Sequence, residues 1–288
     1  MTKFLQKFVV TVSIISFGTS VAAEAATIHH WRFEENPGFL IDSVGSSHLT
    51  GDAVQKTLPG SGAGSLFPDP LYVPGGGSNS STSDFNGSNA LSTTITPITT
   101  DFTVEAFVHL NSAVDTFAKC IVCSLTNPSS PSTLGFAFEA RLDQYAETQE
   151  RELTLVVSDG DSWTFLGSDF VLETDTDYYV ASAFDLGGDV TFWIQDLTNG
   201  GTLQKVSSTH NVTALNPSPL LTIGDDGTEH FDFAIDGLID EVRLSDSILT
   251  DDQLLVKSTL STPEPSTLLG LGTLALAGGT LLRRKRKA

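Results

Sequence analysis

The sequence predicts an all-β domain built as a two-sheet antiparallel sandwich. Roughly ten to twelve short stretches have the alternating or continuous apolar pattern of strands. Residues that favour turns separate these stretches throughout, and a helical pattern inside the domain occurs only near its end. Many short strands with turn signals between them are typical of sandwiches and barrels. The length of 288 residues suffices for one large domain of this kind between two terminal segments.

The first 25 residues have the pattern of an export signal. Lys3 and Lys7 precede an apolar run at residues 8–17, and small residues follow it up to Ala25. This order of charge, apolar run and small residues predicts a signal peptide over residues 1–25. A retained membrane anchor is the alternative, and it is less favoured because the apolar run is short for a span.

The strands of the domain follow in order. Residues 28–35 form the first predicted strand, and residues 59–83, rich in Gly, Pro and Ser, predict a long surface loop. Residues 159–161 and 186–189 are predicted hairpin turns. The remaining strands are predicted at residues 84–91 (a hairpin), 101–109, 117–124, 134–140, 152–157, 163–166, 178–185, 190–195 and 220–224.

The last predicted strand, residues 235–244, carries two adjacent carboxylates, Asp240 and Glu241, among apolar residues. Carboxylates inside a sheet must be paired, solvated or bound to a metal ion, because an isolated buried charge is very costly. Thr250 and Gln253 then form a capping-box pattern, which predicts one or two helical turns.

Three motifs resemble the laminin-G-like branch of the concanavalin A-like lectin/glucanase superfamily. They are the opening WRFEE at residues 31–35, the FNGSN turn at residues 85–89 and the closing GLIDEVRL at residues 237–244. The resemblance covers nearly all of residues 27–258 and implies a concanavalin A-like jelly roll for a domain at residues 26–258.

The C-terminal segment predicts a membrane helix. A linker at residues 259–265 leads to an uncharged run at residues 266–282 and then to a basic tail at residues 283–288. A helix of this length spans about 26 Å, just enough for a bilayer core. The basic tail would hold this end of the chain in the cytoplasm.

The motif Pro263-Glu264-Pro265, followed by a Gly-rich span and a basic cluster, resembles the PEP-CTERM sorting signal of Gram-negative bacteria. The resemblance implies an exosortase-type processing enzyme as a partner and a link to exopolysaccharide. It also implies an inner-membrane precursor that reaches the cell surface or the extracellular matrix after processing. A plain tail anchor is the alternative.

The charge of the domain excludes one class of partner. Without its two ends, the chain keeps 8 basic and 33 acidic residues, a net charge of about −25. Such a domain does not bind nucleic acid or anionic membrane through bulk electrostatics. The charge attracts cations, and solubility outside the cell explains most of it.

Cys120 and Cys123 are the only cysteines of the chain. Residues three apart on a strand face opposite ways, so a disulfide between them requires a turn or a bulge. Two small buried thiols are therefore the favoured interpretation, and a local disulfide in an oxidising compartment is the second. Neither accompanying cysteines nor suitably spaced histidines indicate a zinc site.

Known catalytic patterns are absent from the sequence, so no catalytic residue is predicted. Glucanases of the superfamily that the chain resembles use Glu-x-Asp-x-Glu, which does not occur here. Asp240 and Glu241 are consecutive, so a regular strand would point them to opposite faces. A Gly-x-Ser-x-Gly elbow and a His-Glu-x-x-His helix are also missing.

The resemblance implies a structural calcium ion where the first and last strands meet. Asp42 and Asp240 are the candidate ligands, with Glu34 as a weaker one. In the alternative interpretation Asp42 caps a turn, and Asp240 pairs with Arg243 or lies at the surface. A second acidic segment, residues 225–232, is predicted to be a solvated turn.

Sugar binding requires exposed aromatic rings beside polar groups. Trp193, Trp163 and Tyr145 are the candidates, and Trp193 is expected on a partly open strand face. Packing in the core or on a sheet is the favoured alternative for each of them.

These observations predict a non-catalytic, exported binding or structural module of the cell envelope or exopolysaccharide matrix. The first alternative is a calcium-dependent carbohydrate-binding lectin. The second is a glycoside hydrolase or polysaccharide lyase with an unrecognised site.

Overall fold

The computed structural model describes residues 27–34, 39–57, 67–69, 79–111, 118–125, 130, 132, 134–142, 151–226 and 233–256. The predicted signal peptide, linker, membrane helix and basic tail lie outside these residues. Within the described part of the chain, no helix is long and apolar enough to cross a membrane.

The described residues form β-strands that alternate with turns and loops. The strands are β1 (Thr27–Trp31), β2 (Thr50–Gly51), β3 (Val54–Thr57), β4 (Ser81–Asn86), β5 (Leu91–Thr94), β6 (Phe102–Leu110), β7 (Ala118–Leu125), β8 (Leu134–Leu142), β9 (Arg151–Ser158), β10 (Trp163–Val171), β11 (Asp177–Phe184), β12 (Asp189–Asp196), β13 (Gln204–Thr209), β14 (Leu220–Ile223) and β15 (Asp236–Ser245).

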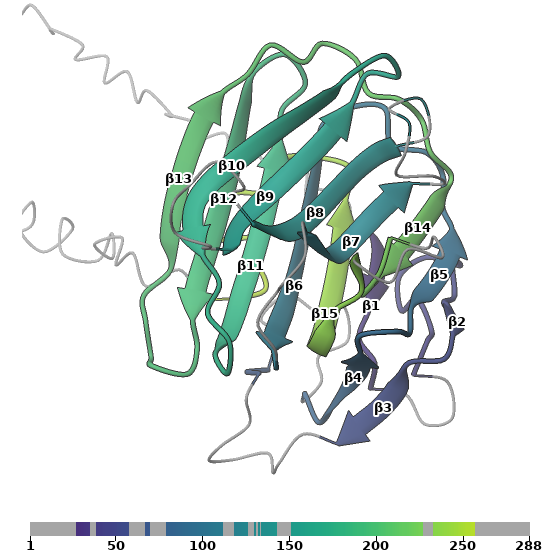
Figure 1. Cartoon of the computed structure of the whole chain (residues 1–288), viewed down its shortest axis with the longest axis vertical. Coiled ribbons are helices and arrows are strands. Elements are labelled where there is room, and N and C mark those ends of the chain that lie inside the picture. Colours follow the sequence, from purple (N-terminus) through teal and green to yellow (C-terminus); the bar gives the residue numbers. More distant parts are fainter. Residues whose placement is uncertain are drawn as a thin grey trace, which may run out of the picture.

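The strands form two antiparallel sheets that lie face to face, so the predicted sandwich is confirmed (Figure 1). The larger sheet has 8 strands in the order β13-β12-β11-β6-β15-β4-β3, with β1 also paired to β15. The smaller sheet has 7 strands in the order β10-β9-β8-β7-β14-β5-β2. In Figure 1 the smaller sheet lies in front of the larger one.

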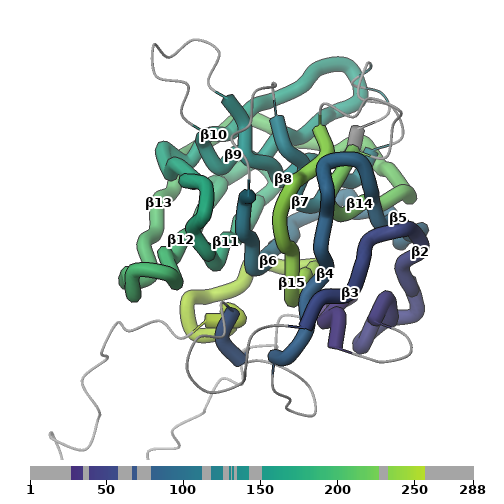
Figure 2. The backbone as a smooth tube through the Cα atoms, turned by 60° about the horizontal axis from the view of Figure 1, so that its bottom comes forward, coloured from purple at the N-terminus to yellow at the C-terminus, as the bar shows by residue number. Residues whose placement is uncertain are grey.

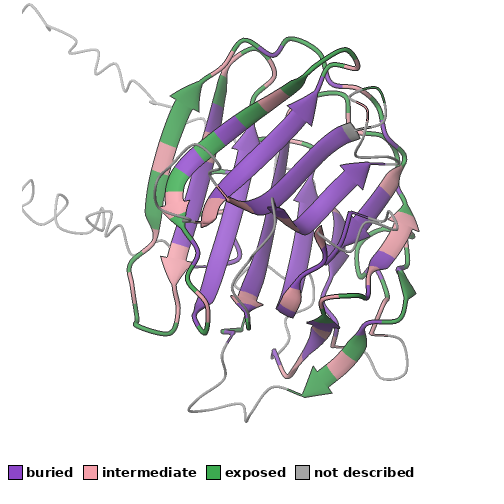
Figure 3. Ribbon diagram, viewed as in Figure 1, coloured by how far each residue is buried: buried purple, intermediate pink, exposed green. Residues whose placement is uncertain are grey.

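The core lies between the sheets and is filled by alternate side chains of their inner faces. Phe102, Phe136 and Phe184 are in ring contact across it, with ring centroids 4.8 and 5.6 Å from Phe102. Figure 3 shows that the central strands are almost wholly buried, whereas the edge strands β3 and β13 are mostly exposed. Burial of this apolar layer drives the two sheets together.

β15 is a central strand that pairs on both of its sides. β6 runs along one side, whereas β4 and β1 share the other side, β4 along the first half of β15 and β1 along the second. The register with β6 shifts between Asp240 and Arg243, and Glu241 has a φ of 49°. These are the features of a β-bulge.

The bulge corrects the expectation that Asp240 and Glu241 face opposite ways. Ile239 and Val242 both lie in the inner core, although they are three positions apart. The two residues between them therefore both face outward, so the carboxylates lie on the same side of the larger sheet. Strict alternation misplaced one of the pair, because the bulge between Ile239 and Val242 inserts an extra residue into the strand.

Three other sequence predictions are wrong in detail. β4 and β5 do not form the predicted hairpin, because they belong to different sheets. The predicted loop 59–83 includes the start of β4 and also Phe67, which is fully buried. Thr250 and Gln253 make the capping hydrogen bond, Thr250 N to Gln253 Oε1 at 2.9 Å, but residues 251–256 form turns and bends instead of a helix.

Residues 249–256, here called the covering segment, pack on the outer face of the larger sheet. Leu249, Leu254 and Leu255 join a second apolar cluster there. Figure 2 shows the chain after β15, in yellow, lying close to β6 and β15. The segment therefore closes a face that would otherwise expose apolar side chains to water.

A buried carboxylate, Glu105 on β6, fastens the covering segment to the sheet. Its Oε1 accepts a hydrogen bond from Nε of Arg243 at 2.6 Å. Its Oε2 accepts one from the Tyr179 hydroxyl at 2.6 Å and one from the Leu255 amide at 2.9 Å. Arg243 in turn donates from Nη2 to the carbonyl of Gln253 at 2.6 Å. The three contacts of Glu105 are buried, and the contact between Arg243 and Gln253 is partly buried.

Replacement of Arg243 by methionine should destabilise the domain strongly. The change leaves the Glu105 carboxylate buried without its counter-charge, which costs about 3–5 kcal/mol. Urea unfolding of Arg243→Met against the wild type measures this loss. Lys56→Met is the matched control. Lys56 lies on the exposed strand β3, and its ammonium is 3.8 Å from the carboxylate of Asp84 on β4. Loss of this exposed ion pair should cost less than about 1 kcal/mol. Equal losses for the two variants would contradict the role of Glu105.

Candidate functional site

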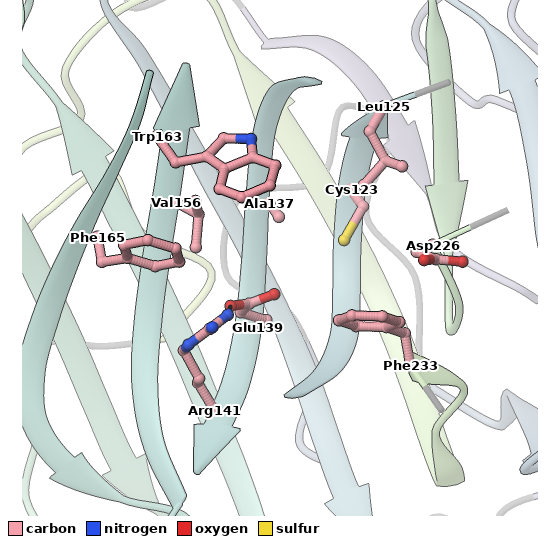
Figure 4. Close-up of a pocket in the computed structure, with 10 residues that line it drawn as sticks. All are labelled: Cys123, Leu125, Ala137, Glu139, Arg141, Val156, Trp163, Phe165, Asp226 and Phe233. Carbon is pink, nitrogen blue, oxygen red and sulfur yellow. Dashed lines mark hydrogen bonds and ion pairs between the residues drawn. The ribbon is translucent and has the colours of Figure 1, made fainter. Parts of the chain in front are cut away.

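A pocket opens on the outer face of the smaller sheet, across β7 to β10. Its volume is about 200 Å³. Figure 4 shows two aromatic side chains of β10 on one side, an ion pair of β8 in the middle and the residues that follow β14 on the other side. It is lined by Cys123, Leu125, Ala137, Glu139, Arg141, Val156, Trp163, Phe165, Asp226 and Phe233.

Two aromatic rings on β10 form one side of the pocket. Leu166 packs in the core between the sheets. Because side chains alternate along β10, Phe165 and Trp163 face outward. Trp163 is 39% exposed and Phe165 is 49% exposed. Large aromatic side chains at this exposure offer a flat surface to a ligand. The sequence prediction of Trp163 as a candidate binding residue is thus compatible with its position, and Phe165 was missed.

Glu139 and Arg141 of β8 form the polar middle of the pocket. Nη1 of Arg141 donates to Oε1 of Glu139 at 2.8 Å, and its guanidinium carbon lies 4.5 Å from the centre of the Phe165 ring. Burial raises the pKa of Glu139, and the charge of Asp226 adds to this, whereas Arg141 opposes it. The sequence analysis predicted neither Glu139 nor Arg141. Their neighbours Phe138 and Ala140 are core residues, so the alternation of the strand places Glu139 and Arg141 on the outer face.

Asp226 closes the far side of the pocket. Asp225 and Asp226 are both buried, which corrects the prediction of a solvated turn for these two residues, whereas residues 227–232 of that segment lie outside the described residues. The turn begins at Gly224, whose φ of 83° and contact with the Phe85 ring leave no room for a side chain. Burial raises the pKa of Asp225 to about 7, and the neighbouring charge of Asp226 adds to the shift. Asp226 therefore places an acidic side chain at this end of the pocket.

Cys120 and Cys123 form a disulfide on β7, so the favoured interpretation of two free thiols is wrong. The register of β7 with β8 shifts between Cys120 and Val122, and this bulge turns both sulfur atoms to the outer face. Their Cα atoms are 6.1 Å apart, within the range of disulfides. The bridge forms part of the wall of the pocket.

Trp193 does not belong to this pocket, and the prediction that it lies on a partly open strand face is wrong. Its side chain is 1% exposed and lies under the covering segment of the larger sheet. Its Nε1 donates to Oδ1 of Asp251 at 2.9 Å, and the ammonium of Lys205 lies 5.0 Å from its ring centre. Trp193 is therefore a packing residue. Tyr145 lies outside the described residues.

Asp42 caps the turn that follows it, in agreement with the alternative interpretation of the sequence. Its Oδ2 lies 2.6 Å from Nδ1 of His29 and accepts the Ser47 amide at 3.2 Å. Its Oδ1 accepts the amides of His30, Val44 and Gly45 at 3.1, 3.2 and 2.8 Å. Burial opposes ionisation, but these bonds lower the pKa of Asp42 to about 2. The oxygen atoms are occupied by N–H groups, so Asp42 does not fit a metal ligand.

Asp240 and Glu34 lie close together on the outer face of the larger sheet. Oδ2 of Asp240 accepts Nδ2 of Asn79 at 2.7 Å, whereas Glu34 accepts hydrogen bonds from Ser80 and Ser81. Burial raises the pKa of Asp240 well above its usual range, and the charges of Glu241 and Glu34 add to this. Arg243 pairs with Glu105, so the predicted alternative of an Asp240–Arg243 pair is wrong.

The oxygen atoms around Asp240 have the chemistry that calcium prefers. Asn79 is 2% exposed, and its Oδ1 has no hydrogen-bond partner among the residues that the structure describes. Against this, the part of the chain that the structure describes holds no group of three or more His, Cys, Asp or Glu side chains arranged for a metal ion. Asp240 and Glu34 therefore fit a calcium ion in chemistry, and Asp42 does not join them.

Comparison with known proteins identifies two parts of the chain. The family model Laminin_G_3, described as the concanavalin A-like lectin/glucanases superfamily, matches residues 76–255. The PEP-CTERM protein-sorting motif matches residues 261–287. This motif marks an exported protein that an exosortase handles at the membrane. No curated protein matches the chain.

Solved structures with a similar fold include two botulinum neurotoxin binding domains. The receptor-binding domain of the mosaic serotype C/D toxin has 11% identity and a TM-score of 0.52, over 79% of this chain and 49% of that one. The binding domain of serotype D/C VPI 5993 has 14% identity and a TM-score of 0.52, over 79% and 50%. This chain thus spans about half the length of those domains.

A third structure is domain 4 of AbnA, an arabinanase from Geobacillus stearothermophilus, in complex with arabinotriose. It has 17% identity and a TM-score of 0.48, over 80% of this chain and 97% of that one. At such identities the two toxin domains indicate the fold alone. The two-sheet jelly roll and the match of the family model over most of the domain show that this chain belongs to the concanavalin A-like lectin/glucanase superfamily.

Proposed function

We propose that this protein is a non-catalytic, exported glycan-binding module of the cell envelope or exopolysaccharide matrix. The observation that carries the proposal is the half-exposed Trp163 at the mouth of an open pocket. Phe165 lies beside it on the same strand face, and Glu139 and Arg141 supply polar groups. A flat ring beside hydrogen-bonding groups is the combination that sugar recognition requires, since sugars have apolar faces and hydroxyl edges.

The size and position of the pocket support a ligand that extends beyond it. Its volume of about 200 Å³ is smaller than the roughly 300–1,000 Å³ of closed ligand pockets. One sugar ring fills such a space, and the rest of a polysaccharide passes over the sheet outside. The export signal supports a glycan on the outer side of the membrane as the partner. Fold alone does not decide this, because function on a common scaffold depends on its sites.

Glycoside hydrolysis is a second candidate function, because one observation favours it. Glu139 has a raised pKa, and the charge of Asp226 contributes to that shift. Two interacting carboxyl groups, one of them with a raised pKa, are the usual pair of a glycosidase. However, Arg141 already holds the Glu139 carboxylate at 2.8 Å. Release of reducing ends from a polysaccharide panel by the wild type, but not by Glu139→Gln, would establish this function in place of binding alone.

Replacement of Trp163 by alanine should weaken glycan binding by about tenfold in Kd, equal to about 1.4 kcal/mol. The change removes the ring on which a sugar stacks and leaves the sheet intact, because the side chain is 39% exposed. Isothermal titration with the oligosaccharide that binds best on a glycan array measures the loss. Val54→Ala is the control, since Val54 is 62% exposed on β3 of the other sheet. Unchanged binding in Trp163→Ala would place the ligand elsewhere.

We further propose that calcium binds beside Asp240 and Glu34 and stabilises the domain. The folded-state pKa of Asp240 lies above its unfolded value, so ionisation of this residue costs stability as the pH rises. A divalent cation would remove that cost. In this proposal calcium supplies charge compensation for the outer face of the larger sheet.

Calcium should raise the melting temperature of the wild type and not that of Asp240→Asn. At a calcium concentration a hundredfold above Kd the expected rise is about 5–10 °C. In chelator, Asp240→Asn should be at least as stable as the wild type, because it removes one repelling carboxylate. Asp42→Asn is the control and should lose stability equally in both buffers. An equal effect of Asp240→Asn in both buffers would mean that Asp240 acts through protein contacts alone.

We also propose that both terminal segments are removed and that the mature protein leaves the inner membrane. The expected species begins near Ala26 and ends close to Pro263, Glu264 and Pro265. Intact mass spectrometry of the protein from the native cell envelope and medium measures both ends. A species that keeps Arg283 to Lys287 would instead make the protein a tail-anchored one, and the link to exopolysaccharide would lose its support.

A further inference from the structure

The pocket on the smaller sheet carries an excess of negative charge, and this excess selects among glycans. Its lining contains two acids, Glu139 and Asp226, and a single base, Arg141. Arg141 is already engaged, because it donates to Glu139 and lies over the Phe165 ring. A negatively charged ligand would therefore meet no available cation among the described lining residues.

The pKa values of the acidic side chains agree with this excess of acidic over basic groups. Burial raises the pKa of Glu139 and the pKa of Asp225, and in both cases the charge of Asp226 adds to the shift. Lys119 opposes the shift in the pKa of Asp225, and Arg141 opposes the shift in the pKa of Glu139. A cation bound between these carboxyl groups would relieve the repulsion and favour their ionised forms.

The aromatic side chains around the acids also favour a cation. The rings of Trp163, Phe165 and Phe233 line the same pocket as Glu139 and Asp226 (Figure 4). The face of an aromatic ring is negative and attracts ammonium groups as well as the apolar face of a sugar. The net charge of about −25 on the domain adds a long-range attraction for cations.

The cation that fits is organic, not a bare metal ion. Part of the lining is apolar, from Leu125, Ala137 and Val156 and from the disulfide at Cys123. A ligand that combines a positive charge with an apolar ring face matches both kinds of surface.

We infer that the pocket binds a glycan residue that carries a free amino group, that is, a de-N-acetylated amino sugar. The sugar ring stacks on Trp163, and its ammonium group lies toward Glu139 and Asp226. This inference rests on the proposed glycan-binding function and adds the class of sugar. An acidic polysaccharide is excluded from the site by the same charges.

The test compares two ligands of equal length on the purified wild-type protein: the tetramer of glucosamine and the tetramer of N-acetylglucosamine. The glucosamine tetramer should bind at least tenfold more tightly by isothermal titration, and its affinity should fall as salt is added. Equal binding of the two tetramers, or tighter binding of the acetylated one, would overturn the inference. This comparison does not depend on the folding of any variant.

Variants then locate the preference. Asp226→Asn and Glu139→Gln should each reduce the preference for the glucosamine tetramer to less than threefold. Asp246→Asn is the matched control, because it removes one exposed acid after β15 and should leave the preference unchanged. Equal losses in Asp226→Asn and Asp246→Asn would assign the preference to bulk charge and overturn the inference. Circular dichroism confirms that each variant is folded.

The outcomes separate the inference from the function on which it rests. If a neutral oligosaccharide binds equally well and Trp163→Ala weakens it, the site is a glycan site without a preference for amino sugars. The inference then fails and the proposed function stands. If no oligosaccharide on a glycan array binds, both fail. If tetralysine binds and the glucosamine tetramer does not, the pocket recognises a basic peptide, and the inference also fails.

Discussion

The fold depends on one buried carboxylate, that of Glu105. It accepts hydrogen bonds from Arg243 on β15, from Tyr179 on β11 and from the backbone of Leu255 in the covering segment. Removal of any partner would leave charge in a region without water, so these elements hold their positions together. The covering segment in turn closes the outer face of the larger sheet. The pocket lies on the outer face of the smaller sheet, where Trp163 is 39% exposed among the described residues.

The sequence predicts the architecture because local signals determine most strands. The turn at residues 186–189 joins β11 and β12 as expected, and the turn at residues 159–161 joins β9 and β10. The same local signals do not determine to which sheet a strand belongs. The prediction of a hairpin at residues 84–91 is wrong for this reason, because β4 and β5 belong to different sheets. The bulge in β15 was also invisible, because the pairing with β6 and the shift at Glu241 depend on strands far away in the sequence. The exposed β13 lacks the apolar pattern that marks the other strands.

The candidate site was predictable only in part, for similar reasons. Trp163 could be nominated from the sequence, but its exposure depends on what packs beside it. Trp193 could be nominated in the same way, but the covering segment, which lies far from it in the sequence, buries its side chain. Glu139 and Arg141 could have been found from the alternation of β8. The burial of Asp226 could not, because it follows from the close approach of Gly224 to a residue of another sheet.

The position of β15 has a consequence for export. The last strand in the sequence lies in the middle of the larger sheet, and its far end pairs with the first strand. The two halves of that sheet are not joined until β15 (Asp236–Ser245) is available. Contacts of such long sequence separation form late and slowly. The larger sheet therefore cannot be completed until a strand that lies close to the sorting motif at residues 261–287 has been synthesised.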